Sequence, residues 1–119
     1  MGGAVAYHAG LAAEHQVAAH YQRAGRKIAA HRWRGRYGGE IDLIAREGDT
    51  VIFIEVKRAA SHAWAAERVT PRQLQRIGIS AEEFVAHRPD CANLDRRFDL
   101  ALVDAQGRIE IVENAYQFD

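Results

Sequence analysis

Near the start of the chain, the apolar residues recur at roughly the spacing of a helix turn. Helix-forming residues predominate from about Ala4 to Ala24, and Gly25 suits the end of a helix. The apolar side of this segment carries Leu11, Val17, Ala18 and Tyr21. A second helix is expected after Thr70, with Pro71 in its first position, and it should end near His87. The pattern therefore predicts two helices.

Other segments have the alternating or continuous apolar residues that are typical of strands. They run over Lys27–Arg34, Glu40–Arg46, Val51–Arg58, Phe98–Val103 and Arg108–Val112. Residues 35–39 include three glycines and predict a loop, and the alanine-rich residues 59–66 predict a mobile loop beside the site. The order helix, three strands, helix, two strands predicts one α/β domain over residues 1–119.

The second and third strands are expected to form a hairpin, because Gly48-Asp49 suits a two-residue turn. With this turn, Asp42 lies directly opposite Glu55. Two residues further from the turn, Glu40 lies opposite Lys57. The other face pairs only apolar residues, namely Ile41 with Val56, Leu43 with Ile54 and Ala45 with Ile52. That face must belong to the core, and a shift of the register by one residue would expose all of it.

The predicted register brings the carboxylates of Asp42 and Glu55 close together, and their charge repulsion must be relieved. Their Cβ atoms would lie about 4.5–5.5 Å apart, and the charges repel unless one is protonated or a cation lies between them. Mg²⁺ takes oxygen ligands and would remove the repulsion between Asp42 and Glu55. Lys57 follows Glu55 by two residues, so it points to the same face of the strand. It can reach a water molecule or a phosphate there without binding the metal.

A plainer interpretation makes this face an exposed one, held by ion pairs across the strands such as Glu40 with Lys57. Against it, Val51 to Val56 is apolar except for Glu55, which is typical of a strand buried on both faces. An acid buried there is destabilising unless it is paired or bound to a metal. The pattern therefore favours a functional site.

Composition narrows the class of protein. The chain of 119 residues is 48% hydrophobic and 27% charged, which suits one soluble globular domain. It has no apolar run of about 18 residues for a membrane span and no secretory signal. Cys91 is the single cysteine, so a cytoplasmic protein without disulfides is expected. The six histidines do not have the spacing of a zinc site.

The net charge is zero, but the basic residues are concentrated in the first third of the chain. Residues 1–39 carry six basic residues and one acid, Glu14. A basic stretch just before acidic motifs is the expected layout for holding a polyanion beside metal-binding carboxylates. The residues expected to contact nucleic acid are Arg26, Lys27, Arg32, Arg34, Arg36 and, after the hairpin, Arg58. A solvated basic face without a partner is the alternative.

Two strings in the hairpin carry a more specific signal. Gly38-Gly39-Glu40-Ile41-Asp42-Leu43-Ile44-Ala45 is followed at the right distance by Val51-Ile52-Phe53-Ile54-Glu55-Val56-Lys57. With them the chain resembles, over about residues 10–119, the YraN family of small bacterial proteins, which are described as predicted endonucleases distantly related to archaeal Holliday junction resolvases. The resemblance implies the PD-(D/E)XK nuclease superfamily. It also implies a restriction-endonuclease-like core, in which a central mixed sheet with the hairpin is flanked by helices.

The resemblance assigns roles to four residues by their position. Asp42 and Glu55 match the acidic metal ligands of the hairpin. Lys57 matches the catalytic lysine, which orients the water and offsets charge in the transition state. Glu14 matches an acid of the first helix that often completes the metal site.

Other positions match the family less closely. Glu40 matches a motif position, at which it would tether Lys57 or shape the preceding loop. Gln73 occupies a catalytic position of the second helix where the family usually has a lysine. Ala59 stands where a second basic residue commonly follows the catalytic lysine, and Ala13 stands where a glycine commonly precedes the helical acid.

These features together predict a Mg²⁺-dependent endonuclease, in which Mn²⁺ can substitute. Its expected substrate is DNA rather than RNA, including branched repair or recombination intermediates. Trp33 and Tyr37 lie within the basic stretch and are candidates for stacking on a base, although packing on the strand is the simpler expectation for Trp33. The alternative is a catalytically inactive module of the same fold that binds nucleic acid or dimerises. A homodimer is also compatible with a nuclease, since branched DNA has two-fold symmetry.

Overall fold

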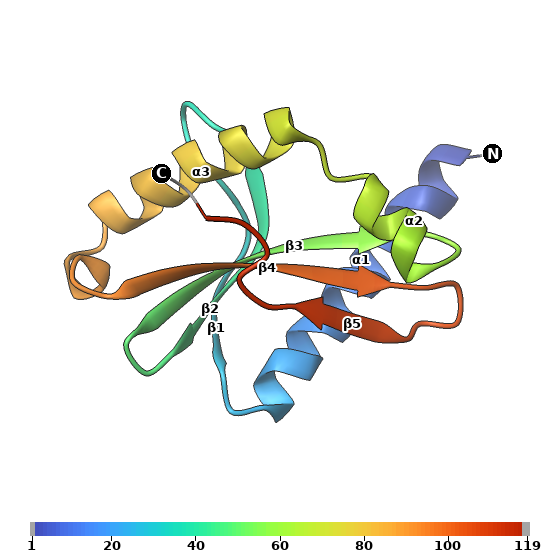
Figure 1. Ribbon diagram of the computed structural model, residues 1–119, viewed down its shortest axis with the longest axis horizontal. Coiled ribbons are helices and arrows are strands. Elements are labelled where there is room, and N and C mark those ends of the chain that lie inside the picture. The colour runs from blue at the N-terminus through green and yellow to red at the C-terminus, as the bar shows by residue number, and fades with distance from the viewer. Residues whose placement is uncertain (1, 118–119) are drawn as a thin grey trace.

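The computed structural model describes residues 2–117, and the side chains of residues 9–117. Its centre is a sheet in the order β1-β2-β3-β4-β5 (Figure 1). The strands are β1 Lys27–Arg34, β2 Glu40–Glu47, β3 Thr50–Arg58, β4 Asp95–Val103 and β5 Ile109–Val112. The β3–β4 pair is parallel and the other pairs are antiparallel. The protein thus has the mixed α/β fold predicted from the sequence, with a restriction-endonuclease-like core.

Helices cover both faces of this sheet (Figure 1). The helical segments are α1 Gly2–Arg23, α2 His62–Glu67, α3 Pro71–Ala86 and the 3₁₀ helix η1 Pro89–Cys91. The start of α3 is capped by Thr70, whose hydroxyl accepts a hydrogen bond from the Gln73 backbone N–H at 3.1 Å. None of the helices in the described part of the chain is both long and apolar enough to cross a bilayer.

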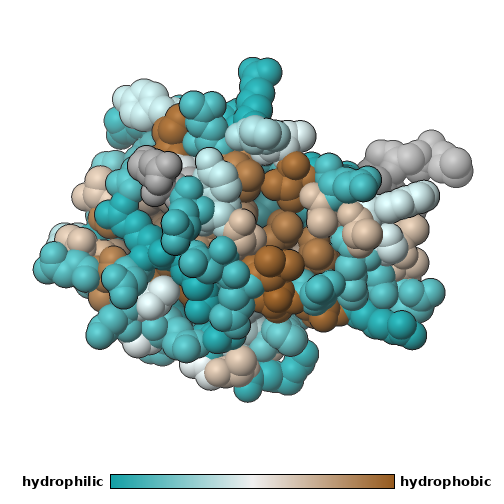
Figure 2. Space-filling view, viewed as in Figure 1, coloured by the Kyte–Doolittle hydropathy of each residue, from teal (hydrophilic) through white to brown (hydrophobic). Residues whose placement is uncertain are grey.

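The prediction of a mobile loop over residues 59–66 is wrong, because most of this segment belongs to α2. The Ser61 side chain caps the helix by accepting a hydrogen bond from the Trp64 backbone N–H. Ala65 is buried against Leu100 and Leu102 of β4. Figure 2 shows hydrophobic side chains gathered over β4 and β5 on this face of the molecule. Packing on this apolar surface, rather than helical periodicity, therefore accounts for α2.

The hydrophobic core has one layer on each face of the sheet. The layer between the sheet and α1 includes Val17, Tyr21, Leu43, Ile52 and Ile54. The layer beneath α3 includes Ile44, Phe53, Ile77, Phe84 and Phe98. The apolar face predicted for the hairpin lies in the α1 layer as far as Leu43, but Ile41 packs in the α3 layer instead.

This change of side coincides with the point where β2 and β3 separate. The predicted register is confirmed from Glu47 opposite Thr50 to Leu43 opposite Ile54, where the backbone pairing of the two strands ends. Beyond that point, the Asp42 carboxylate accepts a hydrogen bond from the Val56 backbone N–H at 2.8 Å. The Asp42 carboxylate thus accepts the hydrogen bond that a backbone carbonyl of β2 would otherwise accept. The two strands therefore separate next to the residues predicted to be catalytic.

A buried polar network fixes α1 against β4. The Tyr21 hydroxyl donates a 2.7 Å hydrogen bond to Asp99, which is fully buried. Asp99 also accepts hydrogen bonds from the Arg97 guanidinium and from the Asn114 backbone N–H. Burial, with help from Asp99, raises the pKa of Tyr21 far above its usual range, so the hydroxyl stays a donor. Glu14 lies two helical turns before Tyr21 on the same side of α1, so this network also helps to place Glu14.

Candidate active site

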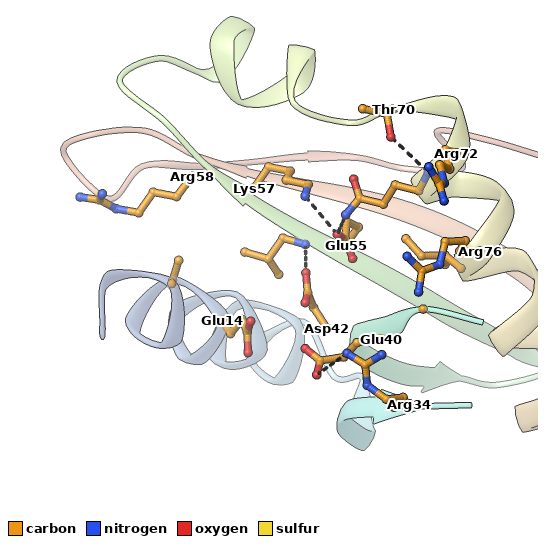
Figure 3. A pocket seen from close by; sticks show the side chains of 16 residues that line it. Glu14, Arg34, Glu40, Asp42, Glu55, Lys57, Arg58, Thr70, Arg72 and Arg76 are labelled. Atoms are coloured by element: carbon orange, nitrogen blue, oxygen red, sulfur yellow. Dashed lines mark hydrogen bonds and ion pairs between the residues drawn. The ribbon is translucent and has the colours of Figure 1, made fainter. Parts of the chain in front are cut away.

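The open ends of β2 and β3 form the floor of a cleft of about 550 Å³. Its walls come from α1 and from the first turns of α3 (Figure 3). Four acidic side chains line it: Glu14, Glu40, Asp42 and Glu55. Five basic side chains line it as well: Arg34, Lys57, Arg58, Arg72 and Arg76. A cleft with acids on its floor and cations around them suits an anionic ligand that is bound together with a metal ion.

The Asp42 and Glu55 carboxylates repel each other on the floor of the cleft. Glu55 is only 4% exposed, and burial raises its pKa to about 9, with a further contribution from Asp42. Burial likewise raises the pKa of Asp42, although the Val56 N–H and the nearby Lys57 ammonium lower it. The Lys57 ammonium offsets part of this repulsion, yet the pKa of both acids stays raised, so a further cation would favour their charged forms.

The two oxygens of Glu55 have different surroundings. Its Oε2 accepts a 2.6 Å hydrogen bond from the Gln73 amide nitrogen and lies 3.3 Å from the Lys57 ammonium nitrogen (Figure 3). Its Oε1 is buried and has no hydrogen-bond partner among the described residues. A buried acceptor without a partner needs an explanation. A divalent cation between Glu55 and Asp42 would satisfy Oε1 and remove the repulsion, so the residues present fit the ion that the resemblance implies.

Glu14 lines the same cleft but is bound to an arginine. The Arg32 Nε lies 3.1 Å from Glu14 Oε1 and 3.9 Å from Glu40 Oε1. Burial, and after it the charge of Asp42, raises the pKa of Glu14. Within the described residues, no three acidic, histidine or cysteine side chains form a ready metal-binding group. The third ligand predicted from the resemblance is therefore present in the cleft wall, where it is held by Arg32.

Arg32 also has an unusual backbone. Its φ is 50°, in the left-handed region that residues other than glycine rarely adopt. Such conformations cost on the order of 1–3 kcal/mol and cluster at functional sites. In β1 the strained residue brings its guanidinium next to the acids of the cleft, which links the strain to the site.

Glu40 does not pair with Lys57, as the simple hairpin register suggested. Its carboxylate lies 3.9 Å from both Arg32 and Arg34, while Lys57 pairs with Glu55 on its own strand. The reason is the separation of the two strands, which removes Glu40 from the position opposite Lys57. Glu40 thus stands at the rim of the cleft among arginines.

The residues predicted to contact nucleic acid do not form one surface. Arg34 and Arg58 line the cleft. Arg26 forms an ion pair with Glu47 beside the hairpin turn, and Lys27 stands opposite Arg46 at the same end of the sheet. That end of the sheet is the one away from the cleft. The cleft therefore contains only part of the basic surface that the sequence predicted.

Two of the cleft cations were missed from the sequence. Arg72 and Arg76 lie four residues apart on α3, so they share one side of the helix and face the cleft (Figure 3). Gln73 of the same helix also lines the cleft. The signal available in the sequence was their position just after the capped helix start at Thr70-Pro71. Together with Arg34 they place positive charge on the α3 side of the floor.

A family model matches most of this chain. The model of the uncharacterised protein family UPF0102 matches residues 13–103. A UPF0102 protein of Cereibacter sphaeroides strain KD131 is 59% identical over 116 residues, which are 98% of each chain. A UPF0102 protein of Ruegeria pomeroyi is 53% identical over 91% of this chain and 87% of its own. One of Ruegeria sp. strain TM1040 is 44% identical over 93% and 89%.

The chain belongs to the UPF0102 family. This is the YraN family, so the resemblance stated from the sequence is confirmed. The match to the UPF0102 model covers Glu14, the whole hairpin and Gln73, which are the residues that meet in the cleft. In this UPF0102 protein the most specific part of the sequence thus lines the cleft that holds the four acidic side chains.

Proposed function

We propose that this UPF0102 protein is a metal-dependent nuclease that hydrolyses phosphodiester bonds of nucleic acid in the cleft. The observation that carries the proposal is the pair of mutually repelling carboxylates, Asp42 and Glu55, with the buried Glu55 Oε1 left without a hydrogen-bond partner among the described residues. Lys57 lies beside the pair, and arginines line the rest of the cleft. This combination suits the cleavage of a polyanion.

Asp42 and Glu55 are the residues that would hold Mg²⁺, or Mn²⁺ in its place. Both offer carboxylate oxygens, the ligands that these hard cations prefer. Glu14 would complete the set once it exchanges Arg32 for the cation. A divalent ion bound there supplies polarisation of the phosphoryl group and a lowered pKa for a water molecule.

Lys57 and Gln73 prepare the site for the reaction. Gln73 fixes the orientation of Glu55 through its 2.6 Å hydrogen bond, and this leaves Oε1 directed away from the donor. The Lys57 side chain is only 16% exposed, so its ammonium group acts in a poorly hydrated environment. There it can position the attacking water and offset the negative charge that develops on the phosphate.

The arginines of the cleft would hold the backbone of the substrate. Arg34, Arg72 and Arg76 stand on the side of β1 and α3, and Arg58 stands at the end of β3 (Figure 3). Guanidinium groups bind phosphates through paired hydrogen bonds, which position the scissile bond over the carboxylates. The family resemblance to junction resolvases favours DNA, and branched DNA in particular, as the substrate class.

The test is cleavage of labelled nucleic acids by the purified protein. Single strands, duplexes, flaps and four-way junctions are incubated with Mg²⁺, with Mn²⁺ or with a chelator. We expect metal-dependent cleavage that falls at least about 100-fold in Asp42→Ala and in Lys57→Ala. Glu82→Gln changes an exposed acid of α3 outside the cleft and should leave the rate unchanged.

Binding of nucleic acid without cleavage would contradict the proposal. If the wild type binds nucleic acid as the two cleft variants do, and cuts none of the substrates with either metal, the proposal is wrong. The protein would then be a binding module of the same fold. Titration with Mn²⁺ supports the same distinction, because only the nuclease requires Asp42 and Glu55 to bind the ion.

A further inference from the structure

The loop between β1 and β2 is clamped onto α3. The Gly39 backbone N–H donates a 3.2 Å hydrogen bond to the Arg76 carbonyl, and the buried Ser80 hydroxyl donates one of 2.5 Å to the Gly39 carbonyl. A third bond, of 2.9 Å, runs from the Arg36 backbone N–H to the Glu83 carboxylate. A Cβ atom on Gly38 would collide with Ser80 and with the Arg76 carbonyl. Close contact and several hydrogen bonds therefore hold this loop in one conformation.

The clamped loop presents an aromatic side chain to solvent. Tyr37 is 78% exposed and is the most exposed large hydrophobic residue among the described side chains. Trp33 is not available in the same way, because it packs edge-to-face on Phe84 with ring centroids 5.3 Å apart. Trp33 of β1 thus packs against α3 in the core, in line with the expectation of packing rather than stacking on a base. Tyr37 remains the aromatic residue of the basic stretch that is free to meet a ligand.

Tyr37 lies in a loop whose two ends line the cleft. The loop leaves the cleft at Arg34 and returns to it at Gly39, both of which line the cleft. Two residues of chain span at most about 7 Å, so the Tyr37 backbone lies within that distance of Gly39. In Figure 1 the loop rises past α3 at the edge of the molecule. Arg34 and Arg36 precede Tyr37 by three residues and by one residue, and both are exposed.

A rigidly held tyrosine close to arginines suits a ligand that carries a planar base on an anionic phosphate backbone, namely a nucleic acid. Stacking on an aromatic ring is worth about 1–3 kcal/mol per base and does not depend strongly on the base. Tyrosine has few rotatable bonds, and the loop is already held against α3, so little conformational entropy is lost on binding. In a continuous duplex the faces of the bases are covered by their neighbours. A stacking residue therefore selects a substrate with an unpaired base.

We propose that Tyr37 stacks on an unpaired base of the nucleic acid whose backbone lies in the cleft. The substrate of the cleft would then carry a single-stranded segment or a break in pairing next to the scissile phosphate. This inference rests on the proposed function in that the cleft takes nucleic acid, but it does not depend on cleavage. The loop with Tyr37 would select the substrate, and the acidic residues on the floor of the cleft would take part in the cleavage.

The experiment measures binding under conditions without cleavage. In the presence of a chelator, anisotropy compares a continuous duplex with the same duplex bearing a single-stranded arm, and 2-aminopurine marks the first unpaired position. Tyr37→Ala should weaken binding of the armed duplex about 5- to 150-fold and binding of the continuous duplex less than about twofold. Quenching of 2-aminopurine on binding should be lost in the same variant.

Matched variants show whether the ring itself is responsible. Tyr37→Phe keeps the ring and should retain both affinity and quenching. Trp64→Ala removes another exposed aromatic side chain, one that does not line the cleft, and should change neither. An equal loss on both substrates in Tyr37→Ala, no loss on either, or a Phe variant as weak as the Ala variant would overturn the inference.

The two proposals can fail separately. If the wild type shows the Tyr37-dependent quenching but cuts nothing when metal is added, the nuclease proposal fails and the stacking role stands. If it cuts DNA while Tyr37→Ala binds the armed duplex as tightly as the wild type, the stacking role fails and the nuclease proposal stands. If neither DNA binds the wild type and neither is cut when metal is added, both proposals are wrong.

Discussion

Gln73 on α3 donates a 2.6 Å hydrogen bond to Glu55 on β3, so α3 fixes a buried carboxylate on the floor of the cleft. The Thr70 cap holds the Gln73 backbone in turn, through the 3.1 Å hydrogen bond at the start of the helix. The contact assigns one oxygen of Glu55 to the protein and leaves the other to a ligand. Affinity for a metal ion should therefore depend on a residue that need not touch the ion.

Removal of the Gln73 amide should loosen this arrangement. Without its donor, Glu55 can rotate away from Asp42, and groups that orient metal ligands are typically worth about 10- to 100-fold in affinity or activity. We expect Gln73→Ala to bind Mn²⁺ about 10-fold more weakly in isothermal titration calorimetry. Gln75→Ala, which changes an exposed amide on the same helix, is the control. Equal affinity in the two variants would contradict the positioning role.

The raised pKa of Glu55 makes stability depend on pH in a defined direction. The folded protein holds the Glu55 proton up to about pH 9, whereas the unfolded chain releases it near the ordinary value of 4.5. The contribution of this group to the free energy of unfolding is therefore greatest at low pH and declines as the pH rises from about 5 to 9. Glu55→Gln cannot ionise, so the variant should be the more stable protein at pH 8, by at least about 1 kcal/mol.

This expectation is checked by urea unfolding in the presence of a chelator. The difference between wild type and Glu55→Gln should widen steadily between pH 5 and pH 9, which separates the effect from other titrating groups. Glu82→Gln removes an exposed carboxylate and should give a nearly constant difference. A difference for Glu55→Gln that stays constant over this range would show that the carboxylate is not destabilised by burial.

Arg32 competes with any cation that approaches the cleft acids. Its guanidinium lies 3.1 Å from Glu14 and neutralises part of the acidic cluster. Arg32→Met removes this positive charge and frees Glu14, so Mn²⁺ affinity should rise about 3- to 10-fold at low ionic strength. Arg26→Met, which breaks an ion pair with Glu47 at the other end of the hairpin, should leave the affinity unchanged. Weaker binding in Arg32→Met would assign the arginine a supporting role instead.

The glycines of the loop make a prediction about stability. Gly38→Ala places a methyl group against Ser80 and the Arg76 backbone, so the loop must leave α3. Overpacking of this kind costs about 1–3 kcal/mol, measured as the change in the free energy of unfolding. Gly10→Ala is the matched control, because a Cβ there meets nothing within 4 Å and alanine favours a helix. Similar stability of the two variants would show that the loop is not clamped.

The core of the hairpin was predictable because its determinants are local. The Gly48-Asp49 turn and the alternation of apolar residues fix the register over five pairs, and the structure has all five. The separation of the strands at Asp42 was not predictable in the same way. It depends on a side chain that replaces a backbone acceptor and on helices that arrive from distant parts of the chain.

The basic residues illustrate the same limit. Charge along the sequence predicted one basic surface, but Lys27 and Arg34 stand at opposite ends of β1. Seven residues of strand span about 23 Å, which separates them more than any local contact could bridge. Arg72 and Arg76 are distant in sequence from Arg34 yet line the same cleft, because α3 crosses the face of the sheet. Only the tertiary fold decides which cations meet.

The hydrogen bond between Tyr21 and Asp99 joins residues 78 positions apart, which has a consequence for the order in which the protein is made. The ribosome delivers α1, the hairpin and α3 before it delivers β4, and a domain generally folds as a unit. Until Asp99 arrives, the last turn of α1 lacks its buried partner, and Glu14 is not yet held at the wall of the cleft. A nascent chain that ends before β4 therefore contains every proposed reactive residue but no finished site, so cutting activity should appear only when synthesis is nearly complete.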